Sequence, residues 1–207
     1  MGEMNAACSW KELFRKGFVD QYMRLITDSY KEMAKETFGG DPPWENTRRN
    51  QLCAWMQKKK ADYGITFHIA PERGVWDENY RDQGRIDLCC YLSELDEDYI
   101  AFECKRFLKK DIRPGYIRSD YCEKGIKRFE KNIYSRNTDI GGMIAFLEEG
   151  DFQKLKEILW EELPNYAADR VVEDRSQEYD HDSIYHTLHY REENQNIRLM
   201  HVLMDFS

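Results

Sequence analysis

Apolar residues recur along this chain at a helical spacing. From residue 10 to about residue 38 they follow the i, i+3, i+4 pattern of an amphipathic helix, either one long helix or two helices broken near Gly17. The glycines and prolines of residues 39–43 end that segment. Further helices are expected over residues 44–60, 119–134 and 151–163, and Asp151 is well placed as the N-cap of the last one.

Continuous or alternating apolar runs predict strands. They lie at residues 65–70, 85–92, 99–107, 142–147, 185–190 and 197–206. The acidic turn 93–98 joins two of them as a hairpin, and the polar stretch 71–83 is expected to be a loop or a loose hairpin. The last strand belongs to the sheet or, as the weaker alternative, forms a dimer edge. This order of elements predicts an α/β fold with a mixed central sheet flanked by helices and an N-terminal helical segment.

Length and composition narrow the class of protein. A chain of 207 residues is enough for one mid-sized domain. No apolar run reaches the roughly 18 residues of a membrane span, and residues 1–10 lack the pattern of a signal peptide, so we expect a cytoplasmic protein. The six cysteines form no C-x-x-C pair and are expected to be reduced core thiols. His186 and His189 fall on opposite faces of a strand, which argues against a zinc site.

The hairpin 85–107 carries the candidate chemistry. Glu103 and Lys105 alternate to one face of their strand, about 6.6 Å apart, and Asp87 is the one acid in the apolar run of the preceding strand. Two carboxylates held together repel each other, and a Mg²⁺ ion between them cancels that repulsion. Such an ion activates water, and a nearby amine stabilises charge on a phosphoryl group.

Two interpretations without chemistry remain open. The three residues are either the exposed face of a surface hairpin or a structural salt-bridge cluster. Charged residues inside apolar strands are costly unless they are paired or bind an ion, so the apolar surroundings of all three favour the metal site.

These residues resemble the PD-(D/E)-x-K (restriction endonuclease-like) nuclease superfamily, including its small bacterial members. The resemblance rests on Asp87, on Glu103 and Lys105, and on the order helix, three strands, helix, strand across residues 44–147. Ile86 stands where that superfamily usually has proline. The resemblance implies a restriction-endonuclease-like core, a nuclease that acts on DNA, and a role in prokaryotic defence, restriction or repair.

The resemblance also implies roles for single residues. Asp87 and Glu103 would hold Mg²⁺ (or Mn²⁺) with the backbone carbonyl of Cys104, whose side chain should face the core. Lys105 would position the attacking water, and Glu45 would hold the metal through water. A basic residue of the following helix, either Lys124 or Lys127, would face the site, and we favour Lys127.

Positive charge is concentrated in residues 105–136. This segment holds eleven Lys and Arg against four Asp and Glu, although the whole chain has a net charge of −8. A basic surface beside a metal site is where a phosphate backbone would lie, and the alternative is a solvated helix face. The expected nucleic-acid contacts are Arg106, Lys109, Lys110, Lys124, Lys127 and Arg128. The acidic segment 147–182 is expected to be a solvated surface or a partner-docking surface.

Other catalytic motifs are absent from the sequence, including the phosphate-binding loop and the nucleophile elbow. The sequence therefore predicts a Mg²⁺-dependent nuclease with an N-terminal helical extension (1–43), a catalytic core (44–147) and a C-terminal helix and strands (148–207). The alternative is a catalytically silent, nuclease-like subunit that binds nucleic acid or a partner protein. Besides nucleic acid, the expected partners are a second copy of the chain in a homodimer or a partner subunit that supplies specificity.

Overall fold

The computed structural model describes residues 19–36, 42–76, 79, 82–91, 99–191 and 195–207. Its α-helices are α2 (Val19–Met33), α3 (Glu45–Lys59), α4 (Pro114–Tyr116), α5 (Lys127–Glu130) and α6 (Phe152–Glu162). A ten-residue π-helix, η4 (Ile117–Ile126), joins α4 to α5. Short 3-10 turns occupy Lys60–Tyr63, Lys109–Asp111, Leu163–Asn165 and Ser176–Tyr179.

Seven strands form one mixed sheet. They are β1 (His68–Trp76), β2 (Asp82–Tyr91), β3 (Tyr99–Phe107), β4 (Ile140–Leu147), β5 (Val172–Asp174), β6 (Ile184–Tyr190) and β7 (Asn196–Asp205). Their order across the sheet is β1-β2-β3-β4-β7-β6-β5. The pairs β3–β4 and β4–β7 are parallel, and the other pairs are antiparallel. The fold is therefore α/β with a mixed sheet.

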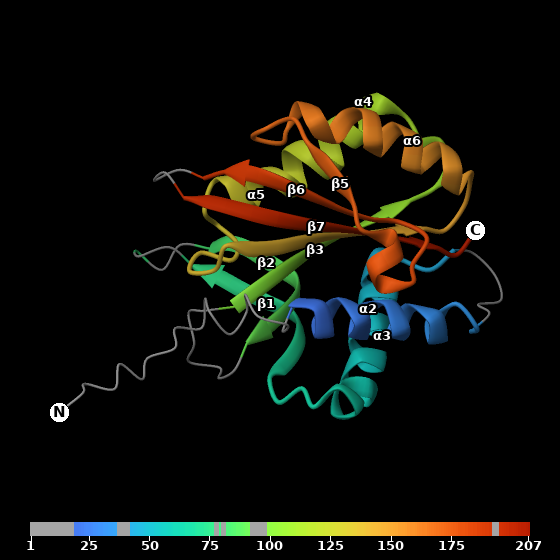
Figure 1. The fold of residues 1–207 in the computed structure, drawn as a ribbon, viewed down its shortest axis with the longest axis vertical. Coiled ribbons are helices and arrows are strands. Elements are labelled where there is room, and N and C mark those ends of the chain that lie inside the picture. The colour runs from blue at the N-terminus through green and yellow to red at the C-terminus, as the bar shows by residue number, and fades with distance from the viewer. Residues whose placement is uncertain (1–18, 37–41, 77–78, 80–81, 92–98, 192–194) are drawn as a thin grey trace.

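Helices cover both faces of the sheet, so the molecule has three layers (Figure 1). On one face α2 and α3 pack against the sheet around a core that includes Leu25, Leu52 and Phe102. On the other face η4, α5 and α6 enclose a second core that includes Tyr121 and Leu159. The central strands β3 and β4 are buried on both faces, as expected for parallel strands between helical layers. A charged residue on β3 is thus costly unless a partner offsets it.

The helix predictions are largely confirmed. The first segment is helical over α2, while residues 10–18, with Gly17, and 37–38 lie outside the described residues. Asp151 caps α6, because its side chain accepts a 3.0 Å hydrogen bond from the Lys154 amide. The bounds 119–134 were wrong. The helical stretch begins at Pro114, whose fixed φ suits a first helical position, and ends at Glu130.

Five of the six predicted strands are confirmed, and the first was misplaced. Instead of 65–70 it spans His68–Trp76 and pairs with β2. Of the two alternatives for residues 71–83, the hairpin is therefore correct and the loop is wrong. The strand tolerates Pro71 because β1 is an edge strand. Strand β5 was not predicted, since three residues are too few to show alternation. β7 lies between β4 and β6, so the dimer-edge alternative is wrong. Residues 92–98 lie outside the described residues.

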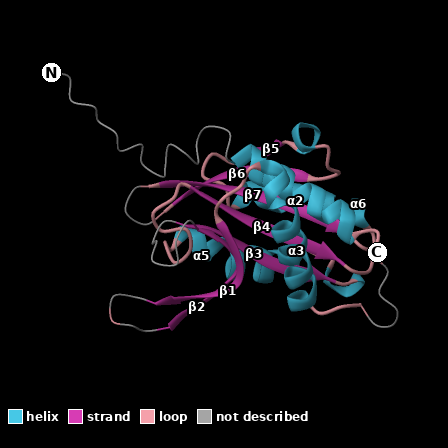
Figure 2. Cartoon of the chain, turned by 90° about the horizontal axis from the view of Figure 1, so that it is seen from below, coloured by secondary structure: helices cyan, strands magenta, loops and turns pink. Residues whose placement is uncertain are grey.

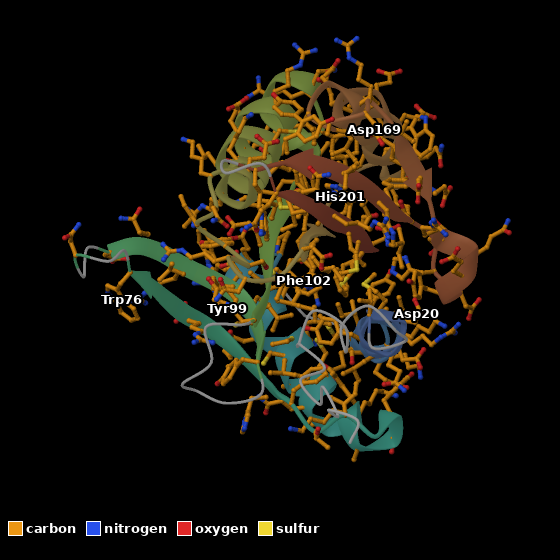
Figure 3. The ribbon with its side chains drawn as sticks, turned by 60° about the vertical axis from the view of Figure 1, so that its left-hand side comes forward. Asp20, Trp76, Tyr99, Phe102, Asp169 and His201 are labelled. Atoms are coloured by element: carbon orange, nitrogen blue, oxygen red, sulfur yellow. The ribbon has the colours of Figure 1, made fainter. Side chains whose placement is uncertain are left out.

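The described cysteines are buried and form no disulfide, as expected (Cys53, Cys89, Cys90, Cys104 and Cys122). Cys8 lies outside the described residues. Within the part of the chain that the structure describes, no helix combines the length and apolar character needed to cross a membrane. Figure 2 shows the β1–β2 hairpin reaching away from the body of the sheet, and Figure 3 places Trp76 on this hairpin and Phe102 and His201 within the body.

Candidate functional site

The candidate site lies where strands β2 and β3 separate. Their antiparallel pairing stops at Leu88 and Phe102, although β2 begins at Asp82 and β3 continues to Phe107. Beyond that point, no described strand pairs with the β2-facing edge of β3. Backbone N–H groups that are removed from water need an acceptor, so side chains must supply it here.

Two carboxylates supply those acceptors. Asp87 Oδ2 accepts a 2.8 Å hydrogen bond from the Cys104 amide, and Glu45 Oε2 accepts a 2.8 Å hydrogen bond from the Arg106 amide. Because the N–H and C=O of one strand residue point to the same neighbour, the Cys104 carbonyl also faces this opening. The thiol of Cys104 is buried in the opposite direction, in the core with Phe102. The structure thus brings Glu45, Asp87 and the Cys104 backbone to one edge of β3.

Glu103 and Lys105 form a buried ion pair on β3. Lys105 Nζ lies 2.8 Å from Glu103 Oε1, and the two side chains are 13% and 4% exposed. The second oxygen, Glu103 Oε2, is buried and has no hydrogen-bond partner, while Arg128 Nη1 lies 3.9 Å from it. Each Glu103 oxygen therefore lies within 4.0 Å of a cation, but a buried carboxylate oxygen without a hydrogen-bond donor is destabilising.

Burial controls the protonation of this cluster. It raises the pKa of Glu103 to about 7, against the effect of Lys105, and the neighbouring Asp87 carboxylate adds to the rise. Burial disfavours the Lys105 ammonium, but Glu103, Glu45 and Asp87 outweigh it and raise the Lys105 pKa above its usual value. Burial also raises the pKa of Glu45. Lys105 is therefore a cation at neutral pH and is unsuited to accept a proton.

Arg49 is the site residue that sequence reasoning missed. Its side chain is 4% exposed, and its guanidinium lies between two acids, with Nη1 3.3 Å from Asp87 Oδ1 and Nη2 3.0 Å from Glu72 Oε1. Glu72 belongs to β1, where its φ of 58° interrupts the regular pairing with β2. The signal was present in the sequence, because Arg49 follows Glu45 by four residues and therefore shares its side of α3.

The helix residue beside Glu103 is Arg128, and the preference for Lys127 was wrong. Lys127 Nζ pairs with Glu130 at 2.6 Å and lies over the ring of Tyr166. Arg128 faces the sheet, donates to the Lys124 carbonyl and contacts the hydroxyl of Tyr134. Consecutive helix residues point about 100° apart, so a shift of one position decides which side chain faces the site.

The cations of the basic segment divide into two groups. Several neutralise nearby acids, as Arg118 does with Glu162 at 2.6 Å and Lys124 with Asp120 at 2.7 Å. Six others have no ion-pair partner among the described residues: Arg106, Lys109, Lys110, Arg113, Lys131 and Arg136. Arg106 and Arg136 are half-buried, and the other four are exposed.

Among the described residues, no group of three or more His, Cys, Asp or Glu side chains is placed to hold a metal ion. Comparisons of the chain with protein-family models, with curated proteins and with solved structures found no match.

Proposed function

We propose that the protein is a metal-dependent phosphodiester hydrolase, a nuclease of the PD-(D/E)-x-K type with a restriction-endonuclease-like core. The observation that carries this proposal is the buried Glu103 oxygen that lacks a donor, beside Asp87 and the Cys104 carbonyl. A hard divalent cation accepts such a sparse set of oxygens because water completes its coordination. The two acids and the carbonyl thus fit Mg²⁺ or Mn²⁺.

The arrangement of elements supports the same proposal. A helix (α3), three antiparallel strands (β1–β3), a helical connection and a parallel strand (β4) follow one another, which is the order on which the resemblance rests. Separation of β2 from β3 opens the sheet at the carboxylates. Catalytic groups need such an opening, since a fully paired strand edge offers no room for substrate.

The residues divide the chemistry among them. Asp87, Glu103 and the Cys104 carbonyl would hold the ion, which supplies an activated water when bound. Lys105, fixed as a cation by Glu103, would orient that water and stabilise negative charge on the phosphoryl group. Glu45 is itself fixed by the Arg106 amide and would hold a water of the ion's shell.

The substrate is a nucleic acid, with DNA favoured by the resemblance. Four cations without ion-pair partners, Arg106, Lys109, Lys110 and Arg113, follow the catalytic lysine directly in the chain. Phosphate contacts of this kind supply most of the affinity of proteins for nucleic acids.

A digestion panel tests the proposal. Plasmid, single-stranded DNA and RNA are incubated with the protein in Mg²⁺, Mn²⁺ or EDTA. We expect metal-dependent cleavage of at least one substrate, and we expect Lys105→Met to slow it by about 10²–10³-fold. Glu149→Gln, which changes an exposed acid that follows β4, is the control and should cleave at the wild-type rate.

The second candidate is the catalytically silent subunit. It is favoured by Arg49, which already neutralises Asp87 as an ion would. Tight binding of an oligonucleotide together with absence of cleavage in every metal would support this alternative and contradict the hydrolase.

A further inference from the structure

Trp44 is the most exposed of the large hydrophobic side chains that the structure describes. It is 76% exposed, against 57% for Trp76 and 43% for Trp160. Exposing an indole to water is unfavourable, and tryptophan is enriched at binding interfaces because it combines a large apolar ring with a polar N–H. Trp44 precedes Glu45 directly, so this indole lies at the rim of the candidate site.

Contacts to the backbone and to the ring of Trp44 fix its position. The Trp44 carbonyl accepts hydrogen bonds from the amides of Thr47 at 2.9 Å and Arg48 at 3.2 Å, which fixes its backbone at the start of α3. The guanidinium of Arg106 lies over the ring, 5.3 Å from its centroid. Because Glu45 accepts from the Arg106 amide, the same contacts that build the catalytic edge also position this pair.

Further positive charge follows Arg106 in the chain. Arg106 has no ion-pair partner among the described residues, and Lys109 and Lys110 follow it in an exposed 3-10 turn. Asp111, the acid of that turn, is buried and accepts from the Leu108 amide, so it presents little charge to solvent. An exposed aromatic ring beside an arginine that has no ion-pair partner matches the chemistry of single-stranded nucleic acid, where bases stack and phosphates bind Lys and Arg.

We propose that Trp44 is a stacking platform for an unpaired base next to the cleaved phosphate, and that the substrate is single-stranded nucleic acid. The proposal rests on the proposed function for its substrate class. The phosphates on either side of the stacked base lie on Arg106, Lys109 and Lys110. A duplex keeps its bases stacked on one another and offers no free base face to the indole.

Binding of a fluorescein-labelled single-stranded 12-mer of mixed sequence, measured in EDTA by fluorescence anisotropy, tests this inference without any cleavage. Trp44→Ala is expected to weaken binding roughly 5- to 150-fold, the range that corresponds to loss of one stacked base. Trp44→Phe keeps an aromatic face and should retain most of the affinity. Trp160→Ala removes another exposed indole, on α6, and should bind like wild type.

Two results would overturn the inference: equal binding by Trp44→Ala and Trp160→Ala, or a wild-type protein that binds the matching duplex as tightly as the single strand. These results differ from a failure of the proposed function. Cleavage that persists unchanged in Trp44→Ala overturns the platform and keeps the hydrolase. Loss of binding in Trp44→Ala without any wild-type cleavage keeps the platform and removes the hydrolase.

Discussion

At the scale of single residues, Glu103 explains why this site is unusual. One of its oxygens is paired with Lys105 at 2.8 Å, and the other is buried without a donor. Natural proteins tolerate such a cost mainly where function requires it. This oxygen lacks a hydrogen-bond donor and has Arg128 Nη1 3.9 Å away, so it is the residue-level signature of a position that receives positive charge.

This cost predicts that Glu103→Gln is more stable than wild type at high pH. The pKa of Glu103 in the folded protein is about 7, above its ordinary value of 4.5, because of burial. The contribution of a group with a raised pKa is present at low pH and is lost as pH rises through about 7. In EDTA at pH 8 we expect Glu103→Gln to exceed wild type in free energy of unfolding, measured by urea denaturation.

The same comparison at pH 5.5 is the control, since wild-type Glu103 is then protonated and the gain should vanish. A variant that is less stable than wild type at pH 8 would show that ion pairing with Lys105 outweighs burial.

At the scale of elements, helix α3 connects the two sides of the site. Its first residue, Glu45, reaches β3, and Arg49 reaches Asp87 on β2. Between them, Arg48 forms a bidentate ion pair with Glu148 at the end of β4, at 2.7 and 2.9 Å. Polar contacts from α3 thus reach β2, β3 and the end of β4.

Breaking the Arg48–Glu148 pair should destabilise the protein strongly. The two side chains are 5% and 2% exposed, and removal of one partner leaves the other charge buried. We expect Arg48→Met to lower the free energy of unfolding by roughly 3–5 kcal/mol. Lys35→Met removes a partner from a pair in which Lys35 is 69% exposed, and a shift below about 1 kcal/mol is expected there. Equal effects of both variants in denaturant titrations would contradict a stabilising role of the buried Arg48–Glu148 pair.

Elements were predictable from the sequence where one local pattern decides them. Alternation along 99–107 identified β3 and the face shared by Glu103 and Lys105, because side-chain period depends only on local backbone geometry. Partners from distant elements were not predictable in the same way. The packing of α3 brings Arg49 to the site, and the positive φ of Glu72 brings that residue there. The π-helix η4 sets which side of the following helix Arg128 occupies. No short sequence pattern encodes these three features.

At the scale of the whole molecule, one sheet carries both the candidate site and a buried polar network. Tyr121 contacts His201 at 3.0 Å, His201 and His189 both contact Thr187 at 2.7 Å, and His189 contacts Glu130 at 3.1 Å. This chain of hydrogen bonds ties η4 and α5, and with them Arg128, to β6 and β7. His201 is fully buried, so the network requires it to stay neutral.

Burial therefore predicts acid lability of the whole fold. It lowers the pKa of His201 well below its usual value and that of His186 to about 4. Groups with a lowered pKa contribute stability above the unfolded value of about 6.5, and this contribution is lost as pH falls toward 4. The melting temperature should decline as pH falls from 6.5 toward 4. His201→Asn should make this decline less steep. His68→Gln, which changes an exposed histidine, is the control and should leave the decline unchanged. A melting temperature that stays constant from pH 6.5 to 4.5 would contradict this account.

The most direct test of the central claim is a Mn²⁺ titration followed by electron paramagnetic resonance of the free ion. The wild-type protein is expected to bind a single Mn²⁺ per chain, with binding weakened at least tenfold in both Asp87→Asn and Glu103→Gln and unchanged in Glu149→Gln. If wild type takes up no ion, or if all four proteins bind Mn²⁺ equally, the carboxylates between β2 and β3 do not form a metal site.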